Sequence, residues 1–124
     1  MKLQNITTDN TTESAATYAL CYSCHDRTTL LSGATNFRNS SDNRHFLHVS
    51  EQRTPCSTCH DPHGISSTQG TTTNNTHLIN FNTAIVSPPN STTTIIRYVD
   101  GGSPGTRYCQ LRCHGQTHSS GMSY

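Results

Sequence analysis

Three short cysteine–histidine motifs carry the chemistry of which this sequence is capable. Two have the pattern C-x-x-C-H, at residues 21–25 and 56–60, and a third, at residues 109–114, has one more residue between its cysteines. These motifs use every cysteine of the chain, namely Cys21, Cys24, Cys56, Cys59, Cys109 and Cys113. A C-x-x-C pair followed at once by histidine is the attachment signature of c-type haem.

The pattern has a geometric reason. Two thioether bonds fix one edge of a porphyrin, and the adjacent imidazole is thereby delivered to the iron as its proximal ligand. The sequence therefore predicts three covalently bound c-type haems, held by the six cysteines. Their proximal iron ligands are His25, His60 and His114.

Other uses of the cysteines are open. In an exported chain the six could pair as disulfides, but that pairing does not explain the histidine after each motif's second cysteine. Zinc is a second alternative, although zinc sites take such units in even numbers or with histidine at finger spacing. A thioredoxin-like redox role is a third, and no βαβ pattern surrounds the motifs.

Five further histidines are candidates for the distal ligands of the three irons. Three of them are expected to serve, and the candidates are His48, His77, His118, His63 and His45. His63 and His118 follow proximal histidines so closely that their tethers cannot pass around the macrocycle edge, so each is expected to reach a neighbouring haem. Because the chain has only two methionines, we expect bis-histidine ligation at most sites.

The stretch from His45 to Gly64, with its run Pro-Cys-Ser-Thr-Cys-His-Asp-Pro-His-Gly, resembles multihaem c-type cytochromes of metal-reducing bacteria. Residues 75–81 and 113–118 share this resemblance, which spans about residues 18–118. It implies that these histidines ligate haem or line its pocket, and that the protein passes electrons at or beyond the cell surface. Some members of that family polymerise into haem-lined filaments. The chain departs from the family in its short length, its C-x-x-x-C-H spacing and its richness in Thr and Asn.

The composition is poor for a globular domain of 124 residues. Only 30% of the residues are apolar, against roughly 45–50% in ordinary soluble domains. Haems would supply the apolar volume that the side chains lack. We therefore expect mostly irregular loops with short α-helices around covalently bound haems, and little or no β-sheet. Residues 1–15 are expected to form a polar N-terminal arm, and residues 16–124 a single trihaem module.

A few segments show a local pattern. Residues 17–25 predict a helical turn or two, and residues 44–49, if helical, place His45 and His48 on one face. A strand is predicted over residues 95–99, closed by an Asp-Gly-Gly turn. The apolar cluster of note between them consists of Leu78, Phe81 and Ile85.

Electron transfer is the expected function, because six-coordinate iron has no open position for a substrate and an enzyme is therefore not expected. Exposed haem edges at both ends of a small module would stack head to tail, which predicts an extracellular filament of copies of the chain. Other redox proteins or extracellular acceptors are the further partners expected. The alternatives are a monomeric periplasmic or surface shuttle, a small haem reductase with one five-coordinate iron, and a disulfide-stapled surface module.

Charge and hydropathy exclude two classes of partner. The net charge is +1 with a single lysine, which gives no basic patch for nucleic acid. No apolar run approaches the roughly 20 residues of a membrane span. Since haem is attached to such motifs outside the cytoplasm, an extracellular or cell-surface location is expected, although the sequence itself shows no secretory signal.

Overall fold

The computed structural model describes residues 4–33, 35–39, 42–65, 76–103 and 105–124. The chain divides into two compact units, Met1–Ser57 and Thr58–Tyr124. The boundary falls inside the second cysteine motif, so that Cys56 belongs to the first unit and Cys59 to the second. The expected arm and single haem-bearing module stay predictions.

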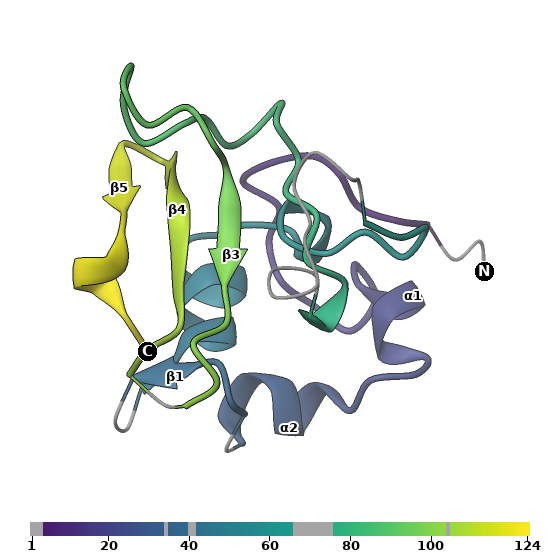
Figure 1. Ribbon diagram of the computed structural model, residues 1–124. Helices are drawn as coiled ribbons and strands as arrows, with labels where there is room; N and C mark the ends of the chain where they lie inside the picture. Colours follow the sequence, from purple (N-terminus) through teal and green to yellow (C-terminus); the bar gives the residue numbers. More distant parts are fainter. Residues whose placement is uncertain (1–3, 34, 40–41, 66–75, 104) are drawn as a thin grey trace. The chain divides into compact units, whose positions relative to one another are not determined.

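The first unit holds short helices and one small hairpin (Figure 1). Its elements are α1 (Ala19–Tyr22), α2 (Arg27–Ser32), β1 (Arg38–Asn39), β2 (Asp42–Asn43), the π-type helix η1 (Phe46–Glu51) and the 3₁₀ turn η2 (Cys56–Thr58), which crosses the boundary. The helical turn predicted within residues 17–25 is confirmed as α1. As expected, no helix in the described part of the chain has the length and apolar character needed to cross a membrane.

Short polar side chains set the ends of these helices. The Asp26 carboxylate accepts the backbone N–H of Thr29 at 2.6 Å and so caps α2 at its start. At the other end, the Asn43 amide donates to the carbonyls of Leu30 and Gly33 at 2.8 and 3.0 Å. The side-chain oxygen of Asn43 accepts the backbone N–H of Phe46, the first residue of η1, at 3.1 Å. Asn43 therefore joins the end of α2 to the start of η1.

The second unit contains a three-stranded antiparallel sheet. Its elements are η3 (Thr76–Leu78), β3 (Arg97–Val99), β4 (Tyr108–Cys113), β5 (Gln116–His118) and η4 (Ser120–Met122). The green-to-yellow arrows of Figure 1 show β4 between β3 and β5. Ser87, which lies outside the named strands, pairs with Arg112 of β4. The backbone N–H of each residue donates to the carbonyl of the other, at 2.9 and 2.7 Å. The strand predicted within residues 95–99 is confirmed as β3.

A two-residue turn joins β4 to β5. Cys113 pairs with Gln116 across the hairpin, which leaves His114 and Gly115 as the loop. Both loop residues have positive φ, 47° and 79°, as a type I′ turn requires. This turn matches the right-handed twist of the two strands and fixes their register.

The core of the second unit lies against β3 and β4. Its buried residues are Phe81, Val86, Tyr98 and Leu111. Around them pack the half-buried side chains of Cys59, Ile79, Ile85, Ile96, Cys109, Cys113 and Tyr124. Phe81, from the cluster singled out in the sequence, is a core residue, whereas Leu78 is 51% exposed.

The expectation of little or no β-sheet is wrong, because the described residues contain two small antiparallel sheets, β1–β2 and β3–β4–β5. Residues 108–113 alternate, with Cys109, Leu111 and Cys113 on one side of the strand. An alternating segment followed by a turn with glycine at its second position is a hairpin signal. The third cysteine motif occupies this hairpin.

Candidate functional site

The first motif lies on one helical turn. The backbone N–H groups of Cys24 and His25 both donate to the Cys21 carbonyl, at 3.2 and 3.0 Å. This turn places the two cysteines, three residues apart, on the same face. Cys21 is half-buried in α1, and Cys24 and His25 are exposed. The geometry fits two thioether bonds to one porphyrin edge, with the histidine beside them.

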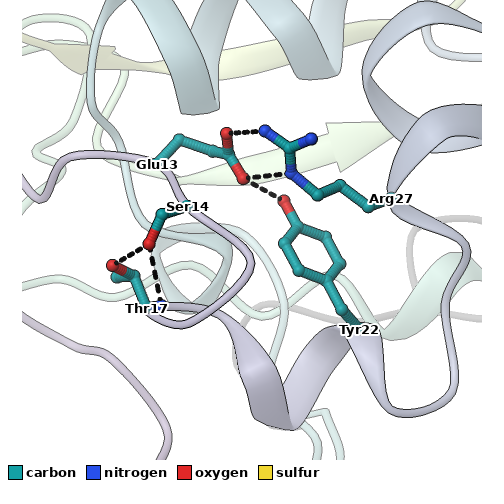
Figure 2. A network of polar contacts seen from close by, with 5 residues as sticks. All are labelled: Glu13, Ser14, Thr17, Tyr22 and Arg27. Carbon is teal, nitrogen blue, oxygen red and sulfur yellow. Dashed lines mark hydrogen bonds and ion pairs between the residues drawn. The ribbon is translucent and has the colours of Figure 1, made fainter.

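A polar network anchors this motif (Figure 2). One carboxylate oxygen of Glu13 accepts from the Tyr22 hydroxyl at 2.9 Å and from Arg27 Nε at 2.9 Å, and the other accepts from Arg27 Nη2 at 2.6 Å. The hydrogen bond from Arg27 holds the pKa of Glu13 below its ordinary value. Nearby, Ser14 Oγ accepts the backbone N–H of Thr17 at 3.0 Å. Because Tyr22 lies between the two cysteines, the network fixes the motif to the segment that precedes it.

The thiols of Cys21 and Cys56, from two different motifs, share a hydrogen bond. That bond is the main cause that lowers the pKa of Cys21 to about 7. Burial, followed by the proximity of Cys56 and Cys21, raises the pKa of Tyr18. The Tyr18 hydroxyl is buried, and it has no hydrogen-bond partner among the described residues. Such an orphaned hydroxyl costs about 1–3 kcal/mol, so a group bound beside these thiols could stabilise the site by accepting its proton in a hydrogen bond.

The second motif begins with the single 3₁₀ turn η2. In the first unit, the Ser57 hydroxyl donates to the backbone carbonyl of Ile6, which ties the start of the motif to the N-terminal segment. In the second unit, Cys59 packs against the core, and burial raises the pKa of its thiol. In the sequence, the two cysteines of this motif have the same three-residue spacing as those of the first motif.

The third motif does not fit that chemistry in its observed conformation. Cys109 and Cys113 lie four residues apart on β4, which separates their Cα atoms by about 13 Å at the rise of a strand. Two thiols so far apart along one strand do not meet one porphyrin edge. The Cys109 sulfur instead lies 3.3 Å from the Tyr124 hydroxyl oxygen, and burial raises the pKa of this thiol to about 11.

Three histidines have Nδ1 facing an oxygen that can only accept a hydrogen bond. His48 Nδ1 lies 2.7 Å from the Arg44 carbonyl, and His60 Nδ1 lies 2.8 Å from the carbonyl of His77. His63 Nδ1 lies 3.0 Å from a carboxylate oxygen of Asp61. Nδ1 must therefore carry the proton, and in the neutral ring the lone pair lies on Nε2. Metal-ligating histidines are held in this way.

Two other candidates for distal ligand, His45 and His77, have no such fixed Nδ1 proton. His45 and His48 both contact Phe37: the His45 ring meets it edge-on with ring centroids 5.1 Å apart, and the His48 ring stacks on it at 5.5 Å. His45 Nδ1 lies 3.4 Å from the Thr35 hydroxyl, which can donate or accept, so its tautomer is not fixed. His77 has a φ of 62° and its exposed ring meets Tyr98 edge-on at 6.5 Å.

The other two histidines belong to the hairpin. His114 is the first residue of its turn, and half-buried His118 in β5 pairs with Leu111. Within each unit the structure thus brings together thiols of different motifs: Cys21 with Cys56, and Cys59 with the cysteines of β4.

The sequence reasoning missed the aromatic residues beside these groups. Tyr18 precedes Cys21 by three residues, a helical spacing that could have identified it as a neighbour of the thiol. Phe37 lies in a polar stretch, and no local pattern distinguishes it. Tyr124 reaches Cys109 from the end of the chain through a tertiary contact.

In the described ranges, no group of three or more His, Cys, Asp or Glu side chains is arranged to hold a metal ion. A haem iron takes only two ligands from the protein, so that finding concerns other kinds of metal site. No protein family, curated protein or solved structure matches the chain.

Proposed function

We propose that the protein is a trihaem c-type cytochrome that carries electrons along stacked bis-histidine haems, as the repeating subunit of an extracellular filament. The observation that carries the proposal is the common state of His48, His60 and His63, each with Nδ1–H directed at an acceptor-only oxygen. When bound, haem would supply a one-electron iron couple. The chain supplies thiols, imidazole lone pairs and a fixed orientation for each ring.

The first two motifs support the proposal most directly. Cys21 and Cys24 lie on one helical turn, and the 3₁₀ turn η2 begins the second motif. His60 would be the proximal ligand of the second motif, and the carbonyl of His77 holds its ring by accepting from Nδ1. Such a second-shell hydrogen bond fixes the tautomer and raises the basicity of the ligating nitrogen.

The tautomer of each ring also separates the candidates for distal ligand. His48 and His63 have the tautomer that places the lone pair on Nε2. We propose these two as distal ligands and propose His77 or His118 as the third. The third haem itself is included on the sequence of its motif alone, because β4 would have to leave its pairing for Cys109 and Cys113 to approach each other.

Intact mass and optical spectra of the protein isolated from a host that attaches haem test the assignment. The expected mass is that of the polypeptide plus three haems, with a Soret band and a low-spin spectrum. Replacing Cys56 and Cys59 by serine removes one haem and leaves the others, which makes this double variant the matched control. A mass with two haems rejects attachment at the third motif, and a chain without a Soret band rejects the function altogether.

Two further measurements address the alternatives. A ferrous spectrum that changes with carbon monoxide at neutral pH would favour a reductase with a five-coordinate iron over an electron carrier. Negative-stain microscopy and size exclusion test the filament. Rods are expected, and a monodisperse species of one chain at micromolar concentration would favour the monomeric shuttle.

A further inference from the structure

Residues 119–124 fold back onto the start of β4, where the third motif begins. Their short 3₁₀ helix η4 contacts the strand. The backbone N–H of Tyr124 donates to the Arg107 carbonyl at 2.9 Å, one residue before the strand starts. Within the segment, the backbone N–H of Met122 donates to the Ser119 carbonyl, also at 2.9 Å, and closes a turn. We call this segment the strap.

Tyr124 brings the strap to the sulfur of Cys109. The Tyr124 hydroxyl oxygen lies 3.3 Å from Cys109 Sγ, and both side chains pack against the core of the second unit. The backbone that accepts the strap is itself anchored by a largely buried ion pair, in which Arg107 Nε lies 3.0 Å from a carboxylate oxygen of Asp100. The Cys109 thiol is thus packed on the core and bonded to a residue that is held in place.

We propose that Tyr124 is an autoinhibitory cover for the third motif, which keeps the Cys109 thiol of the haem-free chain from reacting with electrophiles until the strap is released. The packed ring holds the cover in place, and the hydroxyl occupies the sulfur as its hydrogen-bond partner. Burial acts in the same direction, because it raises the pKa of Cys109 to about 11 and the thiolate is the reactive form. Cys113 lies about 13 Å further along β4, so the cover acts on Cys109 alone.

The cover concerns the third site of the proposed function, and its role in maturation rests on that function. Cys109 and Cys113 approach each other only when β4 leaves its pairing. The strap opposes this rearrangement, since it is bonded both to Cys109 and to the residue that precedes the strand. Release of the strap is therefore a change that the third motif requires before its two thiols can act together.

The test alkylates the full haem-free chain with iodoacetamide, in a reaction in which the thiolate displaces iodide. At timed intervals the chain is denatured and its remaining thiols are blocked with N-ethylmaleimide. Trypsin then separates the two cysteines of the motif, because cleavage after arginine leaves Cys109 in residues 108–112 and Cys113 in residues 113–124. Mass spectrometry of these two peptides gives the alkylation rate of each thiol.

We expect Tyr124→Ala to raise the alkylation rate of Cys109 at least tenfold and to leave the rate of Cys113 unchanged. Tyr124→Phe keeps the packed ring, and it should give no increase because the hydroxyl that it removes lowers the pKa of Cys109. The matched control within the strap is Met122→Ala, at an exposed position, which should leave both rates unchanged.

Two results would overturn the proposal. An unchanged rate of Cys109 in Tyr124→Ala would show that Tyr124 does not cover the thiol. Equal rises at Cys109 and Cys113 in that variant would show that the whole strand has opened, which would leave the strap without a specific role. Because both rates are measured without haem, a failure of the proposed function changes neither of them.

Discussion

Glu13 and Arg27 form a two-point ion pair, in which Arg27 Nε and Nη2 lie 2.9 and 2.6 Å from the two carboxylate oxygens of Glu13. The first cysteine motif lies between these two residues in the sequence. The same carboxylate also accepts the hydroxyl of Tyr22, which belongs to that motif (Figure 2). A single side chain thus holds the turn that presents Cys21 and Cys24.

This contact makes the stability of the first unit depend on pH. Because the folded state lowers the pKa of Glu13 below its ordinary value of 4.5, the stabilisation is fully present above that value and is lost as the pH falls through the folded pKa. Glu13→Gln should therefore lower the free energy of unfolding at pH 7 and have little effect near pH 3. Urea unfolding at both values measures this difference. The exposed Glu51→Gln is the control, and an equal deficit at both pH values would contradict the prediction.

The thiols of the haem-free chain should differ in reactivity. The pKa of Cys21 is lowered to about 7, whereas burial raises that of Cys109 to about 11. Near neutral pH, Cys21 should therefore react with iodoacetamide at least tenfold faster than Cys109, since the thiolate is the reactive form. Timed alkylation in a Cys24→Ser background, followed by mass spectrometry of residues 3–27 and 108–112, measures both rates. Equal rates would show that the Cys21–Cys56 contact does not form.

His48 rather than His45 should be an iron ligand in the haem-loaded protein. Both rings contact Phe37, but only His48 has its Nδ1 proton fixed by a backbone carbonyl. We expect His48→Ala to produce a high-spin fraction in the ferric spectrum. The matched variant His45→Ala should stay low-spin, and the reverse pattern would exchange the two assignments.

The core of the second unit should be sensitive to the loss of Phe81, which is 4% exposed. Phe81→Ala removes a buried ring beside Tyr98 and Leu111, and it should lower the free energy of unfolding by about 3–4 kcal/mol. Phe46→Ala, at a position that is 44% exposed, is the control and should cost far less. Urea unfolding of the haem-free chain compares them. Similar losses for the two variants would place Phe81 outside the core.

Local spacing was enough to predict some elements. The turn around Cys21 follows from a cysteine spacing that suits a helix, and β3 follows from an apolar run closed by an Asp-Gly-Gly turn. Haem attachment, the ligand assignments and the filament stay predictions, because no observed contact tests them.

Local spacing did not predict the strand β4 or the proximity of Cys21 to Cys56. Residues 108–113 carry a cysteine motif as well as an alternating pattern, and the spacing of the motif does not by itself predict the strand β4. The contact between Cys21 and Cys56 joins segments that are distant in sequence, so no local pattern contains it.

The boundary between the two compact units makes neighbouring cysteines into separate reporters of unfolding. Cys56 is protected by the first unit and Cys59 by the core of the second, although only two residues separate them. If each unit opens as its own cooperative block, thiol exchange at these two positions will follow two different opening equilibria. A denaturant too dilute to unfold the whole chain would then expose one sulfur before the other, and the order would rank the stabilities of the two units.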